Sequence, residues 1–332
     1  MTQVVILAAG KGTRFRSKTA KPLQKLGGRT LIDHIISQVQ KFTQDIFIVV
    51  GQDSNRVKKH LSQGKVEFVS QVEQKGTAHA LLQALPLLDP DERVLVLYCD
   101  VPLISEQSLT TLEQLKPGAI GLLTAIFEDP TGLGRIIRDD SGNLKKVVEQ
   151  KVGTPAELAV KEINSGIFIA PVAFLNDTLP RVNNDNAQGE FLLPDIFEMA
   201  VAQNIAVELV SAGNEYEVMG VNDPVQLAQL ERYYQFNLAT HWMQQGVRLA
   251  DPHRIDIRGA VQIGQDVDID VNVILQGNVI IGDDCKIGPN CYLKNAELGR
   301  GVTLKANSVI ENSKIEDGKT IGPHAHEFHY AQ

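Results

Sequence analysis

Residues 4–14 of the chain have the sequence VVILAAGKGTR, in which four aliphatic residues lead directly into a loop of small residues. A short apolar run that ends at glycine is typical of a buried strand. The small residues that follow let backbone N–H groups approach a phosphate, because no bulky side chain blocks them. Arg14 and Lys21 can then offset the charge of a triphosphate.

Two common phosphate-binding motifs are excluded in this loop. A dinucleotide-binding fingerprint needs a third glycine where Phe15 stands, and a Walker A loop needs Gly-Lys-Ser/Thr. Taken alone, the segment fits equally well a glycine turn flanked by surface cations. Its function therefore has to be judged with the rest of the chain.

The first two-thirds of the chain alternates strand patterns with helix patterns. Apolar strands are expected at 4–7, 46–50, 66–69, 94–98 and 120–125. Apolar residues at helical spacing occupy 31–39, 77–85 and 105–115. This alternation predicts an α/β fold with βαβ units on a mainly parallel sheet. Because ligand sites on such sheets lie at the carboxyl ends of strands, the residues after Leu7 and Tyr98 are the first candidates.

A long helix is expected to connect two domains. Asp223 suits its N-cap, Pro224 its first turn and Gly246 its end. Apolar residues follow one face of this helix at Leu227, Leu230, Tyr234, Leu238 and Trp242.

Beyond the helix, the sequence is an internal repeat. Aliphatic residues recur at every sixth position, with one five-residue step, at Ile257, Ile263, Ile269, Leu275, Ile281, Ile287, Leu293, Leu298, Leu304 and Ile310. This period predicts a parallel β-helix, and it resembles the left-handed β-helix of hexapeptide-repeat proteins. Cys285 and Cys291 fall in a small inward position, so they are expected to pack in the core. The few coils favour self-association, and the resemblance implies a homotrimer.

The composition excludes several classes of protein. The chain has 332 residues, of which 43% are hydrophobic and 22% charged, as in an ordinary globular protein. A formal net charge of -8 argues against a nucleic-acid partner. Three cysteines give no disulfide framework, and no apolar run approaches the roughly 20 residues that span a bilayer. We therefore expect a cytoplasmic protein with no membrane partner.

Further motifs follow one another along the chain. They are QVEQKGTAHA at 71–80, YCDVPL at 98–103, PTGLGRI at 130–136, VE at 148–149, EINSGI at 162–167 and GVN at 220–222. Together with LAAGKGTR at 7–14 and Lys21-Pro22, they resemble the signature of sugar-1-phosphate nucleotidylyltransferases. The match extends to the uridylyltransferase half of the bacterial N-acetylglucosamine-1-phosphate uridylyltransferases. It runs from the first strand into the hexapeptide repeat.

The resemblance implies that UTP and N-acetylglucosamine 1-phosphate react to UDP-N-acetylglucosamine and pyrophosphate, with Mg²⁺ as cofactor. It assigns catalysis to Arg14, Lys21 and Asp100, and it makes Asp100 and Asn222 the metal ligands. Mg²⁺ prefers such hard oxygen donors together with phosphates and waters. The implied nucleotide-binding residues are Leu7, Ala8, Ala9, Gly10, Gln71, Gly76 and Thr77. The implied sugar-binding residues are Tyr98, Gly134, Glu149 and Asn164.

Each of these residues also has a plain structural explanation. An aspartate such as Asp100 at the end of a strand is commonly a turn or cap residue, and Asn222 can cap the following helix. Gln71 and Gly76 fit an ordinary strand–turn–helix junction, and His79 is expected to pack or to face solvent. The functional assignment of these positions therefore depends on the whole series of motifs that resembles the family signature.

The chain departs from the family pattern at three places. Cys99 stands where a glycine usually precedes the aspartate, so its thiol can crowd the approach to the metal. Residues 190–195, EFLLPD, replace a second aromatic residue and a threonine at the border of the sugar pocket. Full-length relatives continue with coils that carry an acetyltransferase site, and no acetyltransferase activity is expected here. The histidines of the tail, His324, His326 and His329, have a spacing that can hold a metal, although a solvated or interface-packed tail is the preferred interpretation.

Two alternative functions stay open at this point. One is a nucleotidyltransferase for another sugar, such as glucose 1-phosphate with UTP or dTTP, and the other is a non-catalytic trimeric scaffold. The expected domains are a Rossmann-like nucleotidyltransferase domain at 1–222, a connecting helix at 223–250, a left-handed β-helix at 251–323 and a tail at 324–332.

Overall fold

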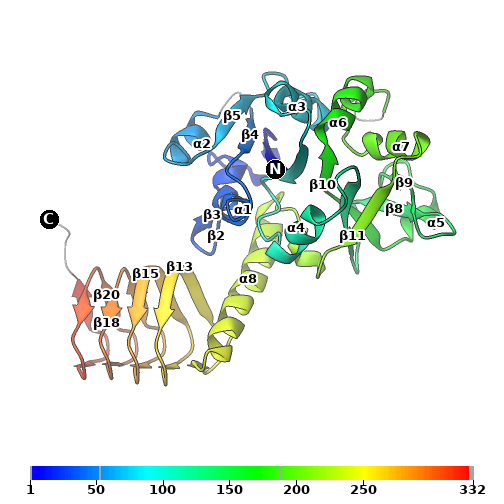
Figure 1. Cartoon of the computed structure of the whole chain (residues 1–332). Helices are drawn as coiled ribbons and strands as arrows, with labels where there is room; N and C mark the ends of the chain where they lie inside the picture. Colours follow the sequence, from blue (N-terminus) through cyan, green and yellow to red (C-terminus); the bar gives the residue numbers. More distant parts are fainter. Residues whose placement is uncertain (1, 52–53, 187–188, 329–332) are drawn as a thin grey trace. The chain divides into compact units, whose positions relative to one another are not determined.

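The structure is a computed structural model that describes residues 2–51, 54–186 and 189–328 (Figure 1). The chain divides into two compact units. The first holds the residues up to Asp223 except residues 25–30, which belong to the second unit. These six residues form a hairpin of β2 (Lys25–Leu26) and β3 (Arg29–Thr30), an arrangement that the sequence patterns did not predict.

A nine-stranded sheet forms the core of the first unit within the described residues. Its main path is β11 (Val207–Ser211), β7 (Ile120–Ile126), β10 (Glu162–Pro171), β6 (Arg93–Tyr98), β1 (Thr2–Ala8), β4 (Ile46–Val50) and β5 (Glu67–Ser70). On this path β10 runs antiparallel to both of its neighbours, while the other pairs are parallel. β8 (Gly134–Arg138) and β9 (Leu144–Val148) extend from β10 as an antiparallel pair.

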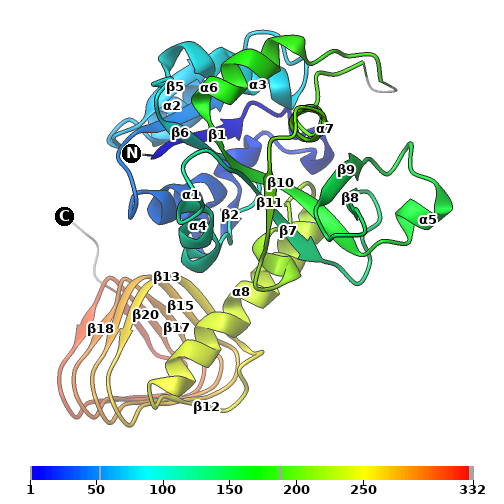
Figure 2. The ribbon, with the colours of Figure 1, turned by 45° about the vertical axis from the view of Figure 1, so that its right-hand side comes forward.

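Helices cover both faces of this sheet (Figures 1 and 2). α3 (Thr77–Ala84), α6 (Val172–Thr178) and α7 (Asp195–Ala202) pack on one core cluster, and α1 (Leu31–Val39) and α4 (Glu106–Glu113) pack on the other. Residues of β1 alternate between the two clusters, with Val5 in the first and Ile6 in the second. Because both faces are buried, the strand is apolar throughout rather than alternating. α2 (Asn55–His60) and α5 (Pro155–Leu158) complete the α-helices of the described part of this unit, which also contains short 3-10 helices.

The α/β fold predicted from the sequence is confirmed. The five predicted strands and three predicted helices appear within two residues of their expected bounds. The later elements, β8 to β11 and α5 to α7, had no clear periodic pattern to reveal them.

After the hairpin at 25–30, the second unit continues with α8 (Pro224–Gln244), the predicted long helix. Gln235 is buried on this helix, and its amide binds the backbone of Ile257 twice. Its Nε2 donates to the Ile257 carbonyl at 2.8 Å, and its Oε1 accepts from the Ile257 N–H at 2.7 Å. The side chain therefore occupies the place of a neighbouring strand.

The rest of the unit is a parallel β-helix, whose stacked coils are seen in Figure 2. One sheet contains β12 (Arg248–Leu249), β14 (Asp268–Ile269), β16 (Lys286–Ile287), β19 (Thr303–Leu304) and β22 (Thr320–Ile321). The other contains β13 (Ile255–Ile263), β15 (Val273–Ile281), β17 (Tyr292–Lys294), β18 (Glu297–Leu298), β20 (Val309–Glu311), β21 (Lys314–Ile315) and β23 (His326–Phe328). Ile257 pairs with Leu275 and Leu275 with Leu293, so three hexapeptides make one coil. The left-handed β-helix predicted from the repeat is thus confirmed.

Smaller side chains share the interior of the coils with the aliphatic residues of the repeat, as the period predicted. Cys285 and Cys291 are buried there, and their thiols donate to the carbonyls of Gly299 and Lys305. Asparagines at the corners adopt left-handed φ angles, for example 59° at Asn290, a conformation that asparagine tolerates better than most residues. Among the described residues, no helix combines the length and apolar character needed to cross a membrane.

Candidate active site

Three cavities lie side by side at the carboxyl edge of the sheet in the first unit. The loop cavity, of about 850 Å³, extends from the glycine loop to the start of α2. The central cavity, of about 380 Å³, adjoins it and shares Gly10 and Lys21 with it. The outer cavity, of about 280 Å³, shares Tyr98 and Asp100 with the central one. Residues that follow β1 and β6 thus line the site, as expected for the carboxyl ends of strands in such a sheet.

Lys21, Asp100 and Asn222 meet between the central and outer cavities. The Lys21 ammonium forms a short ion pair with Asp100 Oδ2 and donates to Asn222 Oδ1 at 2.8 Å. The Lys21 and Asp100 side chains are only 11% and 19% exposed, so water screens this pair weakly. Two oxygen donors from distant parts of the chain therefore face one cationic nitrogen.

The surroundings of these oxygens suit a bound cation. The Asp100 carbonyl accepts from the Val221 N–H at 2.8 Å, which holds the two segments together. A side chain at Gly220 would begin 3.9 Å from Asp100 Oδ2, so glycine keeps this space free. One carboxylate and one amide oxygen are a donor set that Mg²⁺ accepts while it keeps waters and phosphate oxygens. The residues present thus fit a divalent cation.

Cys99 lines the central cavity beside Asp100. Burial, followed by the charge of Asp100, raises the pKa of the Cys99 thiol to about 12. The thiol therefore stays protonated and packs among apolar neighbours of the sheet. A neutral, largely buried thiol brings no additional charge to the site.

A tight turn around Gly76 closes one end of the central cavity. Gly76 has a φ of 118°, and a Cβ there would overlap the Phe191 carbonyl oxygen. Phe191 clamps the turn by donating its N–H to the Lys75 carbonyl at 2.8 Å and accepting from the Ala78 N–H at 2.9 Å. Thr77 fixes the same segment, because its hydroxyl accepts from the Leu193 N–H at 3.1 Å. The glycine is therefore required by the backbone itself.

The side chain of Gln71 is buried in the wall of the central cavity, with 3% exposure. Its Nε2 donates to the Gly76 carbonyl at 3.1 Å and lies 3.0 Å from His79 Nδ1. His79, which was expected to pack or to face solvent, thus packs against Gln71. Its polar contact was not predicted.

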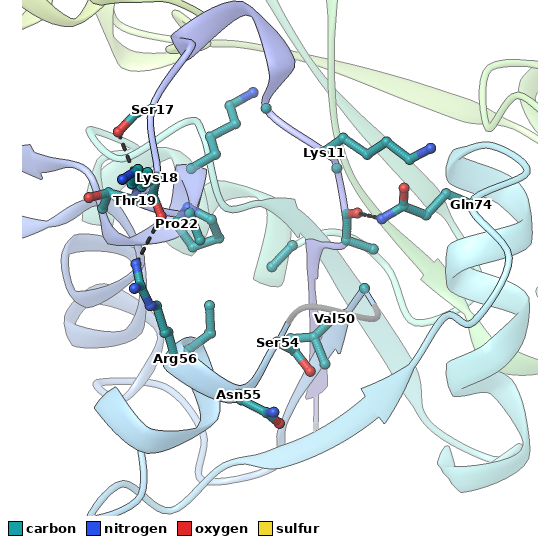
Figure 3. A pocket seen from close by; sticks show the side chains of 18 of the residues that line it. Lys11, Ser17, Lys18, Thr19, Pro22, Val50, Ser54, Asn55, Arg56 and Gln74 are labelled. Atoms are coloured by element: carbon teal, nitrogen blue, oxygen red, sulfur yellow. Dashed lines mark hydrogen bonds between the residues drawn. The ribbon is translucent and has the colours of Figure 1, made fainter.

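The loop cavity is lined by basic side chains (Figure 3). Lys11 and Lys18 lie on its walls, and Arg56 donates from Nη1 to the Lys18 carbonyl at 2.9 Å. Gln74 fixes the glycine loop through a short hydrogen bond from its Nε2 to the Ala9 carbonyl. The cavity can therefore attract an anion beside the loop.

The predicted sugar residues gather in the outer cavity. Gly134, Glu149 and Asn164 all line it together with Tyr98. Asn164 Oδ1 accepts from the Gly166 N–H at 2.9 Å. Burial raises the pKa of the Glu149 carboxyl, Asp195 raises it further, and Arg135 opposes the rise.

The segment at 190–195 divides its residues between two cavities. Glu190 lines the central cavity, whereas Leu192 and Pro194 line the outer one. Leu133 adds another apolar side chain to the outer cavity. The outer cavity therefore presents apolar surface beside its carboxylate and amide.

The other predicted site residues occupy different places. Leu7 and Ala9 line the central cavity, and Ala8 lines the loop cavity. Arg14 is exposed in the short helix Thr13–Phe15 and lines none of these three cavities.

Three residues of the site were not singled out as binding residues from the sequence. These are Lys18, Arg56 and Gln74. Gln74 alone of these three carried a signal, because it belongs to the motif at 71–80.

The tail histidines give no metal site in the described part of the chain. His326 Nε2 lies 3.4 Å from Glu311 Oε2, and His329 lies outside the described residues. No group of three or more His, Cys, Asp or Glu side chains within the described ranges is arranged to hold a metal.

Comparisons with known proteins fit this geometry. A model of the MobA-like NTP transferase domain matches residues 4–126, and a model of the GMPPB C-terminal domain matches residues 257–327. The bifunctional protein GlmU of Ruthia magnifica subsp. Calyptogena magnifica is 42% identical over 97% of this chain and 71% of its own length. That of Pseudomonas entomophila is 45% identical over the same shares of the two chains.

The chain belongs to the GlmU family. It is accordingly a sugar-1-phosphate nucleotidylyltransferase. A Bacillus anthracis protein described as a glucose-1-phosphate thymidylyltransferase, solved in complex with a sucrose, has a similar fold. Its TM-score is 0.59 at 18% identity, and the match covers 70% of this chain and 94% of that one.

Proposed function

We propose that the chain transfers a uridylyl group from UTP to N-acetylglucosamine 1-phosphate. The central cavity would take the nucleotide and the outer cavity the sugar. This assignment is supported by Asp100, which lines both cavities and contacts Lys21 of the central one. The observation that carries this proposal is the shared contact of the Asp100 and Asn222 oxygens with one ammonium. Membership of the GlmU family and the match to an NTP transferase domain support a reaction of this class.

The reaction is an in-line displacement at phosphorus. A phosphate oxygen of the sugar forms a bond to the α-phosphorus of UTP, and the bond from that phosphorus to the bridging oxygen breaks. Pyrophosphate leaves with the electron pair. The attacking oxygen is already anionic, so no general base is needed, and the protein contributes positioning and charge neutralisation.

Each group of side chains has a distinct part in that step. Lys21 neutralises phosphate oxygens at the junction of the cavities, and the small residues of the glycine loop leave backbone N–H groups accessible to the triphosphate. Lys11, Lys18 and Arg56 attract the charged end of the nucleotide. When bound, Mg²⁺ would be held by Asp100 and Asn222 and would neutralise charge on the phosphates.

A pyrophosphate-release assay over a grid of nucleotides and sugar phosphates tests the proposal. UTP with N-acetylglucosamine 1-phosphate should give the highest kcat/KM, with a requirement for Mg²⁺ that EDTA abolishes. The most informative comparison is with the kcat/KM values for glucose 1-phosphate and for dTTP, because these are the substrates of the alternative function. Absence of metal-dependent release from every pair would refute the enzymatic proposal and favour a scaffold.

Two further proposals concern the β-helix. We propose that the chain forms a homotrimer through this unit, where a groove of about 590 Å³ runs along the sheet of β12, β14, β16 and β19. Light scattering on the full chain should give three times the mass of the 36.4 kDa protomer. The lack of acetyltransferase activity stays a prediction, which release of the coenzyme A thiol from acetyl-coenzyme A with glucosamine 1-phosphate would contradict.

A further inference from the structure

We propose that Arg135 is a positioning residue of the outer cavity, which ties the loop before Gly134 to the turn after Glu149 and so holds the Glu149 carboxylate in place. Arg135 itself lines none of the three cavities of the site. The inference rests on the proposed function, because its test uses the sugar phosphate that the outer cavity would bind.

The guanidinium of Arg135 is buried without a paired charge. The residue is 2% exposed, and its side-chain hydrogen bonds in the described part of the chain go to neutral oxygens. Its Nε has no hydrogen-bond partner there. An arginine is rarely buried so completely unless it is paired, because removing a charge from water is costly. Core packing alone therefore does not explain this residue.

Two hydrogen bonds join Arg135 to the segments on either side of it. Nη1 donates to the Leu133 carbonyl in a short hydrogen bond, and Nη2 donates to Gln150 Oε1 at 2.8 Å. The same oxygen of Gln150 accepts from the Gly132 N–H at 3.1 Å. Because both groups that face this atom are donors, it has to be the oxygen of the amide. Arg135 and Gln150 thus clamp the loop before β8 to the turn after β9.

The clamp lies where the strand pairing stops. β8 and β9 pair as far as Arg135 and Val148, so Glu149 lies just beyond the last pair. A Cβ placed at Gly134 would lie 3.2 Å from Glu149 Oε1, which shows how closely the carboxylate approaches the glycine. Side-chain positions alternate along a strand, so Arg135 extends from the side of β8 opposite to the one that Gly134 leaves open. The clamp therefore holds Glu149 from behind the cavity wall.

The charge of Arg135 supports the same carboxylate. Burial has the largest effect on the Glu149 carboxyl and raises its pKa, and Asp195 raises it further, whereas Arg135 lowers it. An ionised carboxylate only accepts hydrogen bonds, which suits the hydroxyl groups of a sugar. Arg135 therefore favours the accepting form of Glu149 as well as its position.

Two matched variants of Gln150 test the clamp at its less buried end. Gln150→Met removes the acceptor that both donors use, whereas Gln150→Glu keeps an oxygen at that place. In steady-state pyrophosphate release, we expect Gln150→Met to raise the KM for N-acetylglucosamine 1-phosphate about fivefold to tenfold, because a hydrogen bond from a charged donor is lost. The KM for UTP and the kcat should stay within about twofold of the wild type. Gln150→Glu should restore the KM for the sugar phosphate to within about twofold.

Arg135→Met tests the clamp at its buried end. It should raise the same KM by at least about tenfold, because both hydrogen bonds and the charge are lost together. Arg138→Met is the matched control, since Arg138 lies on the same strand but pairs with Glu162 and is 40% exposed. It should change neither KM. Thermal unfolding checks each variant, and the Gln150 pair decides the question if Arg135→Met does not fold.

The outcomes separate this inference from the proposed function. An unchanged KM for the sugar phosphate in Gln150→Met, or equal rises of the KM values for both substrates, would overturn the inference and leave the proposed function intact. A wild type that prefers another sugar phosphate would overturn the proposed function, and the same comparison made with that substrate would still decide the role of Arg135. A wild type that turns over no sugar phosphate would overturn both.

Discussion

The two units of the molecule build their important contacts in opposite ways. In the nucleotidyltransferase unit, single side chains from distant segments converge, as Lys21, Asp100 and Asn222 do. In the β-helix, the same contact recurs from coil to coil, as in the pairing of Ile257 with Leu275 and of Leu275 with Leu293. A single substitution should therefore remove chemistry in one unit and stability in the other.

Asp100→Ala should show the largest effect and affect only chemistry. We expect turnover to fall by at least about 10³-fold, or about 4 kcal/mol of activation free energy, because charge neutralisation at the transferred phosphate is lost. The fold should stay intact, since Lys21 keeps its hydrogen bond to Asn222. Steady-state pyrophosphate release and thermal unfolding measure the two quantities. Turnover within tenfold of the wild type would show that this carboxylate does not hold the metal.

Leu293→Ala should give the converse result in the β-helix. Leu293 is fully buried, and its truncation should lower the free energy of unfolding of this unit by about 2–5 kcal/mol. The kcat per folded molecule should not change, because the side chain belongs to the other unit. Val225→Ala, at a side chain that is 67% exposed, is the matched control. A large loss of kcat without loss of stability would contradict the expectation that substitutions in the β-helix affect stability and not chemistry.

Gly76→Ala should affect stability and activity together, because the turn at Gly76 is both a constrained part of the fold and a wall of the central cavity. The positive φ and the overlap with the Phe191 carbonyl should cost about 1–3 kcal/mol of stability. The KM for UTP should rise as well, since the Gly76 carbonyl holds the Gln71 amide. Gly142→Ala, which also has a positive φ but has open space around it, separates the cost of the backbone from that of the overlap.

The smallest effect is expected at a corner of the β-helix. Asn290 adopts a φ of 59° and accepts from Asn272 Nδ2 at 2.9 Å. Asn290→Ala should cost about 1–2 kcal/mol, because alanine lacks both the tolerance of this conformation and the side-chain hydrogen bond. Asn290→Gly keeps the backbone free to adopt the conformation and should cost less. Denaturant unfolding can rank the two, and equal losses would assign the cost to the hydrogen bond alone.

Sequence patterns predicted those parts of the fold that depend on local periodicity. The apolar run at Val4–Leu7 and the six-residue repeat each specify a buried element directly, because every turn of the pattern repeats the same environment. The hairpin at 25–30 had no such signal, because it depends on contacts with α8. Its Gly27 N–H, for example, donates to the Glu231 carboxylate at 2.7 Å.

The candidate site was predictable only in its residue types. Asp100 and Asn222 were assigned to one metal site only because of the resemblance to the family. No local pattern relates the end of a strand to the start of a distant helix. The clamp of Phe191 on Gly76 and the bond from Gln74 to the Ala9 carbonyl join loops that are far apart in sequence. Such contacts depend on tertiary packing, which periodicity does not encode.

The amide of Gln235 has a consequence for how the β-helix ends. Each coil of a parallel stack offers open backbone groups to the next, so nothing in the repeat itself limits growth into a fibre. In a parallel strand the N–H and carbonyl of one residue point to the same side, and at Ile257 both are already taken by this single side chain. Another strand cannot pair at this point without first displacing the helix, and the stack is thereby protected from end-to-end polymerisation on that side.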